Sequence, residues 1–82
     1  MGRVTTKKRI DRNITGKAVQ RIRLSASPKM TQEDLVGRLA RQGLNLNQSQ
    51  IAKIENAERP ILDYEIAALA KALKVPIQAL FA

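Results

Sequence analysis

Apolar residues recur at helical spacing in several short, separate segments of this chain, and this repetition limits the possible folds more than any other feature. In one segment, Ile66, Leu69, Ala70 and Leu73 follow the i, i+3, i+4, i+7 pattern of a single helix face. The segment 14–24 shows the same period, and no segment alternates apolar and polar residues as a half-buried strand would. The sequence therefore predicts an all-α fold, a compact bundle of five short helices.

Residues that begin and end helices divide the chain at consistent positions. Thr31 and Asn47 have side chains that cap helix N-termini, and we expect Asp63 to cap a further helix in the same way. Gly43 is typical of the end of a helix, and Pro76 is typical of a first helical position. We therefore predict helices over 14–24, 31–43 and 47–56, with two more that begin at 63 and 76.

The chain has 82 residues with no Cys and no His, which restricts its chemistry. It is long enough for one domain, predicted over residues 14–82, which apolar packing alone must stabilise. Disulfides, thiolate metal sites and the usual general base are excluded. Ser25, Ser27 and Ser49 have no His partner, and the sequence offers neither a metal-ligand cluster nor a Gly-rich phosphate loop. We expect no enzyme activity, no cofactor and no metal.

The positive charge is concentrated near the N-terminus. Residues 1–29 contain nine Lys or Arg and one acidic residue, whereas residues 30–82 contain six of each, so the whole net charge of +8 lies in the first third. This asymmetry favours binding to a polyanion, either nucleic acid or an anionic membrane surface. Residues 1–13 lack an apolar period and are interpreted as a flexible basic arm, with a solubilising tail as the alternative. No apolar run approaches the roughly 20 residues of a membrane span, and no secretory signal is visible, so we expect a cytoplasmic protein without a membrane partner.

The segment 47–56 opens with neutral hydrogen-bonding side chains where a soluble helix usually carries Lys and Glu. Ile51 and Ile54 define its buried face. The opposite face is formed by Gln48, Ser49, Ala52, Lys53 and Asn56. These side chains suit a DNA major groove, because Gln pairs with adenine, Lys reaches guanine and a small apolar group contacts the thymine methyl. The alternatives are a merely solvated face and, for Asn47 and Gln50, a capping box.

Three stretches together resemble the phage repressor and Cro-type (XRE) helix-turn-helix family: "MTQEDLVGRL", "SQIAKIENAERPI" and "IAALAKALKVPIQALF". The resemblance covers residues 18–82 and implies a lambda-repressor-like helix-turn-helix domain. It further implies a sequence-specific transcriptional regulator, in particular a repressor, that binds double-stranded DNA as a homodimer. The base-reading positions that it implies are Gln48, Ser49, Gln50, Ala52 and Lys53.

Other positions are assigned to the DNA backbone. The resemblance implies phosphate contacts by Gln32, which opens the second helix, and by Asn56 and Arg59, which follow the third. Lys29 immediately precedes the second helix and is a further candidate for a phosphate contact. For Arg59, a solvated loop cation is the alternative.

Glu55 is an acidic residue beside the predicted DNA-binding face. The resemblance implies that it pairs with an Arg of the first helix, for which Arg23 fits the spacing best and Arg21 is the second choice. The chain departs from the family pattern in a longer first link, in Val36 where a small residue is usual, and in an extended turn, "ARQGLNLNQSQ", between the second and third helices. These departures affect the identity of the base-reading residues more than the fold.

A protein partner is the main alternative to a role on DNA alone. Domains of this type also occur as antitoxin subunits, which bind a toxin as well as DNA. The apolar stretch "VPIQALFA" is the candidate interface, either for such a toxin or for a second copy of the chain. Within it, we expect Val75 and Leu80 in the core, and Ile77 and Phe81 are left open.

Overall fold

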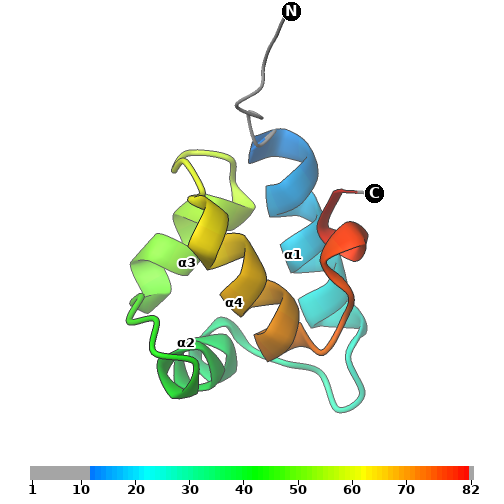
Figure 1. Cartoon of the computed structure of the whole chain (residues 1–82). Coiled ribbons are helices and arrows are strands. Elements are labelled where there is room, and N and C mark those ends of the chain that lie inside the picture. Colours follow the sequence, from blue (N-terminus) through cyan, green and yellow to red (C-terminus); the bar gives the residue numbers. More distant parts are fainter. Residues whose placement is uncertain (1–11, 82) are drawn as a thin grey trace, which may run out of the picture.

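The computed structural model describes residues 12–81, which form four α-helices and one 3₁₀ helix (Figure 1). These are α1 (Arg12–Ser25), α2 (Gln32–Arg41), α3 (Gln48–Glu55), α4 (Asp63–Leu73) and the 3₁₀ helix η2 (Ile77–Phe81). No strand occurs within the described range. The predicted all-α fold is confirmed. The fifth helix is a 3₁₀ segment that begins at Ile77, one residue after the predicted Pro76, and the Ala79 amide donates to the Pro76 carbonyl that precedes it at 2.9 Å.

The first helix begins two residues earlier than predicted, at Arg12 instead of Ile14. Apolar periodicity reports only residues that face the core, so the first turn of a helix can escape it. Residues 1–11 of the predicted arm lie outside the described residues, and the arm stays a prediction.

Two helix N-termini are closed by reciprocal hydrogen bonds. At α2, the Asp34 amide donates to Thr31 Oγ1 at 3.0 Å, and the Thr31 amide donates to Asp34 Oδ2 at 2.9 Å. At α3, the Gln50 amide donates to Asn47 Oδ1 at 2.8 Å, and the Asn47 amide donates to Gln50 Oε1 at 2.9 Å. Both are capping boxes, so the predicted caps Thr31 and Asn47 are confirmed.

The start of α4 differs from the prediction. Asp63 is its first helical residue and not its cap, and Leu62 occupies the N-cap position. The Leu62 amide donates to Glu65 Oε1 at 3.0 Å. The carboxylate of Glu65, at the third position of the helix, thus satisfies the amide of the N-cap residue, whereas the predicted side-chain cap by Asp63 is absent.

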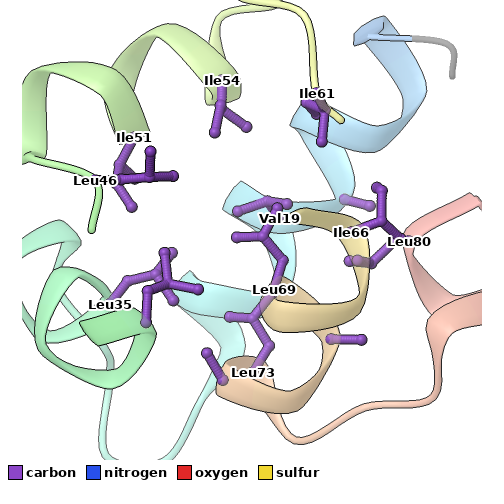
Figure 2. Close-up of a cluster of buried hydrophobic side chains, with 14 of the residues drawn as sticks. Val19, Leu35, Leu46, Ile51, Ile54, Ile61, Ile66, Leu69, Leu73 and Leu80 are labelled. Atoms are coloured by element: carbon purple, nitrogen blue, oxygen red, sulfur yellow. The ribbon is translucent and has the colours of Figure 1, made fainter. Parts of the chain in front are cut away.

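The core is built from aliphatic side chains of all five helices (Figure 2). Val19, Leu35, Ile51, Leu69 and Leu80, one from each helix, are fully buried. Among the helices, α1 contacts α3, α4 and η2, while α2 contacts α3 and α4. This arrangement makes α1 and α2 the supports of α3.

The C-terminal stretch divides between core and surface. Leu80 is fully buried, as predicted, whereas Val75 is only half-buried against the core. Ile77 and Phe81 are exposed, at 42% and 48% of their surface. An apolar surface therefore remains open on η2.

Within residues 12–81, no helix has the length and apolar character needed to cross a membrane. Over the same residues, no group of three or more potential ligand side chains could hold a metal ion.

Candidate nucleic-acid interface

The outer face of α3 carries polar side chains that stand clear of the core. Gln48, Ser49 and Lys53 are exposed, and Ala52 is half-buried beside them. The inner face packs Ile51 and Ile54 into the core (Figure 2). The predicted division of this helix into a buried and an outward face is therefore present.

Gln50 is half-buried and takes part in the cap of α3. Its Oε1 atom accepts the Asn47 amide, so the carbonyl oxygen of the side chain is used within the protein. The capping alternative for this residue is confirmed. The cap does not use the Nε2 donor, which is the group that stays available for a base contact.

The extended turn between α2 and α3 is anchored by its own apolar residues. Gly43 has a φ of 84°, and the Leu44 amide donates back to the Leu39 carbonyl at 3.0 Å. Leu46 is buried and Leu44 is half-buried against the core. Val36, the unusually large residue of α2, packs against the same core without separating α2 from α3.

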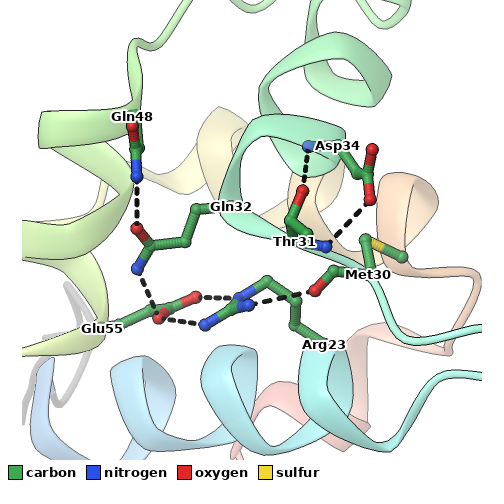
Figure 3. A network of polar contacts seen from close by, with 7 residues as sticks. All are labelled: Arg23, Met30, Thr31, Gln32, Asp34, Gln48 and Glu55. Atoms are coloured by element: carbon green, nitrogen blue, oxygen red, sulfur yellow. Dashed lines mark hydrogen bonds and ion pairs between the residues drawn. The ribbon is translucent and has the colours of Figure 1, made fainter.

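A chain of hydrogen bonds joins the start of α3 to its end by way of α2 (Figure 3). Gln48 Nε2 donates to Gln32 Oε1 at 3.2 Å, and Gln32 Nε2 donates to Glu55 Oε1 at 3.0 Å. Gln32 is the first residue of α2 and Glu55 is the last of α3. The side chain of Gln48 is thus held by Gln32 of α2, which is itself bonded to the end of α3.

The chain of bonds ends in a buried ion pair. Arg23 Nε donates to Glu55 Oε2 at 2.7 Å, and Arg23 Nη2 donates to Glu55 Oε1 at 2.9 Å. Arg23 Nη1 also donates to the Met30 carbonyl at 3.0 Å, which attaches the link between α1 and α2. Arg23 is therefore the partner of Glu55, and the alternative, Arg21, is exposed.

The predicted phosphate-contacting residues have different surroundings. Lys29 and Asn56 are exposed. Gln32 is half-buried, and its side chain is engaged with Gln48 and Glu55. Its backbone amide, however, stands in the first turn of α2, where no preceding turn can accept a hydrogen bond from it.

Arg59 is not the solvated loop cation of the alternative interpretation. Its Nη1 and Nη2 atoms donate to the two carboxylate oxygens of Glu65, each at 2.9 Å, and Nη1 donates to the Pro60 carbonyl at 3.0 Å. Hydrogen bonds from Arg59, reinforced by the Leu62 amide, hold the pKa of Glu65 below its ordinary value, although burial acts in the opposite direction. The same pair raises the pKa of Arg59.

Sequence reasoning missed Glu65 as part of this region. The signal was available: Glu is a favoured residue at the third position of a helix, because its carboxylate reaches back to the free N-cap amide. Glu65 occupies that position in α4 and binds Arg59 as well, so one side chain connects the loop after α3 to the start of α4.

Comparison with known proteins shows a likeness among solved structures. No protein-family model matches the chain, and no curated protein matches its sequence. Among solved structures, the chain is similar to the restriction-modification controller protein C.AhdI from Aeromonas hydrophila, with a TM-score of 0.72 and 24% sequence identity over 87% of this chain and 97% of that one. The likeness shows that the matched part of this chain has the helix-turn-helix fold of that controller protein.

Proposed function

We propose that the protein is a sequence-specific DNA-binding regulator of transcription, a repressor in particular, whose α3 reads the major groove. The observation that carries the proposal is the exposed polar face of α3, held from behind by α1 and α2. The similar structure bears the name of a restriction-modification controller protein, which supports a controlling role for this chain as well.

The chemistry of the α3 face fits base edges. Gln48 can pair with adenine, Lys53 can reach the acceptors of guanine, and Ser49 can donate or accept. Ala52 offers a methyl group for contact with thymine. For Gln50 we propose a donor-only contact through Nε2, since its oxygen is used in the cap.

The flanking residues fit the DNA backbone. The amide of Gln32 lies in the first turn of α2, where the helix dipole favours a phosphate, and Lys29 is exposed three residues before that helix. Asn56 follows α3 directly and is exposed. Arg59 keeps its Glu65 pair and presents the remaining edge of its guanidinium to a phosphate.

We also propose that the regulator acts in the cytoplasm as a homodimer on a pseudo-palindromic site. The exposed Ile77 and Phe81 lie on η2, which is on the opposite side of Figure 1 from α3. Self-association through η2 would leave both α3 helices free to bind half-sites roughly 34–36 Å apart. An exposed apolar surface of this kind is typical of an interaction site.

Selection of duplexes from a random pool tests the proposal directly. The full chain should enrich a two-part consensus with half-sites one helical turn apart, and should bind it more tightly than a scrambled duplex of the same length and composition. Enrichment without any consensus would reduce the protein to a non-specific binder. Absence of enrichment would refute sequence-specific DNA binding and would favour the alternative function, binding to a protein partner such as a toxin.

A further inference from the structure

Gly16 of α1 lies directly against the backbone of α3. A Cβ atom placed on Gly16 would overlap the carbonyl oxygen of Ile54, and would lie 3.3 Å from the Ile54 carbonyl carbon and 3.4 Å from the Glu55 carbonyl oxygen. All three atoms belong to the backbone of the last turn of α3. No side-chain rotation can therefore make room at this position, and the close approach of the two helices depends on the missing side chain.

The same face of α1 carries a second attachment of that turn. Gly16, Val19 and Arg23 are related by i, i+3 and i+7 steps and so share one side of α1. Val19 is fully buried, and Arg23 holds Glu55 through the bidentate ion pair. The last turn of α3 thus rests on α1 through a backbone contact and an ion pair, whereas its first turn is tied to α2 through Gln48.

We propose that Gly16 is a positioning residue for the base-reading surface: its contact with α3 sets where Lys53 stands relative to the DNA bases. The inference rests on the proposed function. Lys53 directly precedes Ile54, so it moves with the Ile54 carbonyl group that Gly16 contacts. A methyl group at position 16 would have to push the Ile54 carbonyl oxygen away by about 1 Å to restore van der Waals separation.

A displacement of this size acts differently on the two kinds of DNA contact. A hydrogen bond to a base edge needs a donor–acceptor distance near 2.7–3.2 Å, so a shift of about 1 Å disrupts it. Attraction between a Lys and the phosphate backbone is less dependent on geometry and carries no sequence information. Gly16 should therefore control discrimination between sequences and not general affinity for DNA.

The test compares Gly16→Ala with Gly37→Ala. Gly37 lies within α2, and a Cβ there would meet nothing within 4 Å, so this variant introduces the same methyl group without a clash. Each protein is titrated with the consensus duplex recovered by the wild type and with a scrambled duplex of equal length. Gly16→Ala should lose about tenfold or more in affinity for the consensus and keep its affinity for the scrambled duplex. Gly37→Ala should match the wild type on both.

The ratio of the two affinities separates positioning from simple loss of folded protein. If part of a variant is unfolded, binding to both duplexes falls by the same factor and the ratio is unchanged. The selected sequences give a second readout. Duplexes selected by Gly16→Ala should lose base preference at the positions where Lys53→Ala loses it, and should keep base preference at the positions that depend on Gln48.

A wild-type affinity ratio in Gly16→Ala would overturn the proposal while leaving the proposed function intact. If Gly16→Ala does not fold, the double variant with Gly37→Ala is used, since the second change stabilises α2. Failure of that protein to fold, seen as loss of helical circular dichroism, would show that Gly16 serves folding alone and would also overturn the proposal. A wild-type protein that enriches no consensus would instead remove the proposed function itself.

Discussion

Gln48 combines an exposed position on α3 with a fixed partner inside the protein. Its Nε2 atom donates to Gln32, which restricts the rotamers of a side chain that is otherwise free at the surface. A side chain that is already ordered loses less conformational entropy when it binds. Lys53 is exposed and must order its longer side chain on contact. Of the proposed base readers, Gln48 is therefore more preorganised for binding than Lys53.

Substitution of either reader should relax base preference at one position of the site. Lys53→Ala and Gln48→Ala are each expected to reduce discrimination at that position by about 1–3 kcal/mol, because a base-edge contact is lost. Binding to a panel of single-base variants of the consensus measures the effect, with Lys71→Ala on the exposed face of α4 as the control. Equal loss on every sequence would mean that these side chains contact only phosphate.

The ion pair between Arg23 and Glu55 contributes to the stability of the folded protein. Its side chains are 9% and 1% exposed, so removal of one partner leaves a buried charge without compensation. Arg23→Ala should lower the free energy of unfolding by about 3–5 kcal/mol, measured by urea denaturation. Arg21→Ala, on the exposed surface of the same helix, should stay within about 0.5 kcal/mol of the wild type. A similar small effect for Arg23→Ala would show that the pair contributes little.

At the scale of elements, Glu65 connects the start of α4 to the loop that follows α3. It is 2% exposed, accepts the Leu62 amide and binds Arg59 with both oxygens. The pKa of Glu65 is lowered in the folded protein from its ordinary value of 4.5. Glu65 therefore contributes its full stabilisation at pH values above 4.5, and this contribution is lost as pH falls through the lowered pKa. The pKa of Asp34 is also lowered, by its hydrogen bonds with Thr31, and its effect on stability has the same sign.

Glu65→Gln should therefore weaken the protein at neutral pH and flatten its response to acid. We expect a loss of about 1–3 kcal/mol in unfolding free energy at pH 7, and a smaller further decrease below pH 4.5 than in the wild type. Urea denaturation across this pH range measures both effects. Glu58→Gln, an exposed acid in the same loop region, is the control. An unchanged acid response would exclude Glu65 as a contributor.

The elements themselves were largely predictable because their signals are local. Apolar residues at helical spacing indicated α1 to α4, Pro76 indicated η2, and Thr31, Asn47 and Gly43 marked helix ends that the structure retains. The errors also have local causes: α1 begins before its apolar period, and α4 is closed by the bond from the Leu62 amide to Glu65 in place of the predicted Asp63 cap.

Contacts within the candidate site were less predictable, because they join residues far apart in the chain. The choice of Arg23 as the partner of Glu55 followed from a family resemblance and is confirmed. The bond between Gln48 and Gln32 depends on the angle between α2 and α3, which an extended turn makes hard to foresee. Which side chains contact DNA stays a prediction, since only the exposure of the α3 face is observed.

For the molecule as a whole, the question is how the N-terminal charge contributes to binding. Residues 1–11 contain four Lys or Arg, and because α1 begins at Arg12, their removal leaves every described helix intact. This truncation should lower the slope of log affinity against log salt by roughly 0.9 for each phosphate that the arm contacts. Binding of both chains to the consensus duplex at several salt concentrations measures it. An identical slope would leave the arm as a solubilising segment.

The network through Gln32 has a practical implication for anyone who wishes to retarget this protein to another operator. Exchange of Gln48 would alter a proposed base reader and at the same time remove the hydrogen bond that joins the beginning of α3 to Gln32 of α2. Ser49 and Lys53 are exposed and take no part in that network. Randomised libraries should therefore vary these two positions and keep Gln48, so that new specificities are sampled on an undisturbed scaffold.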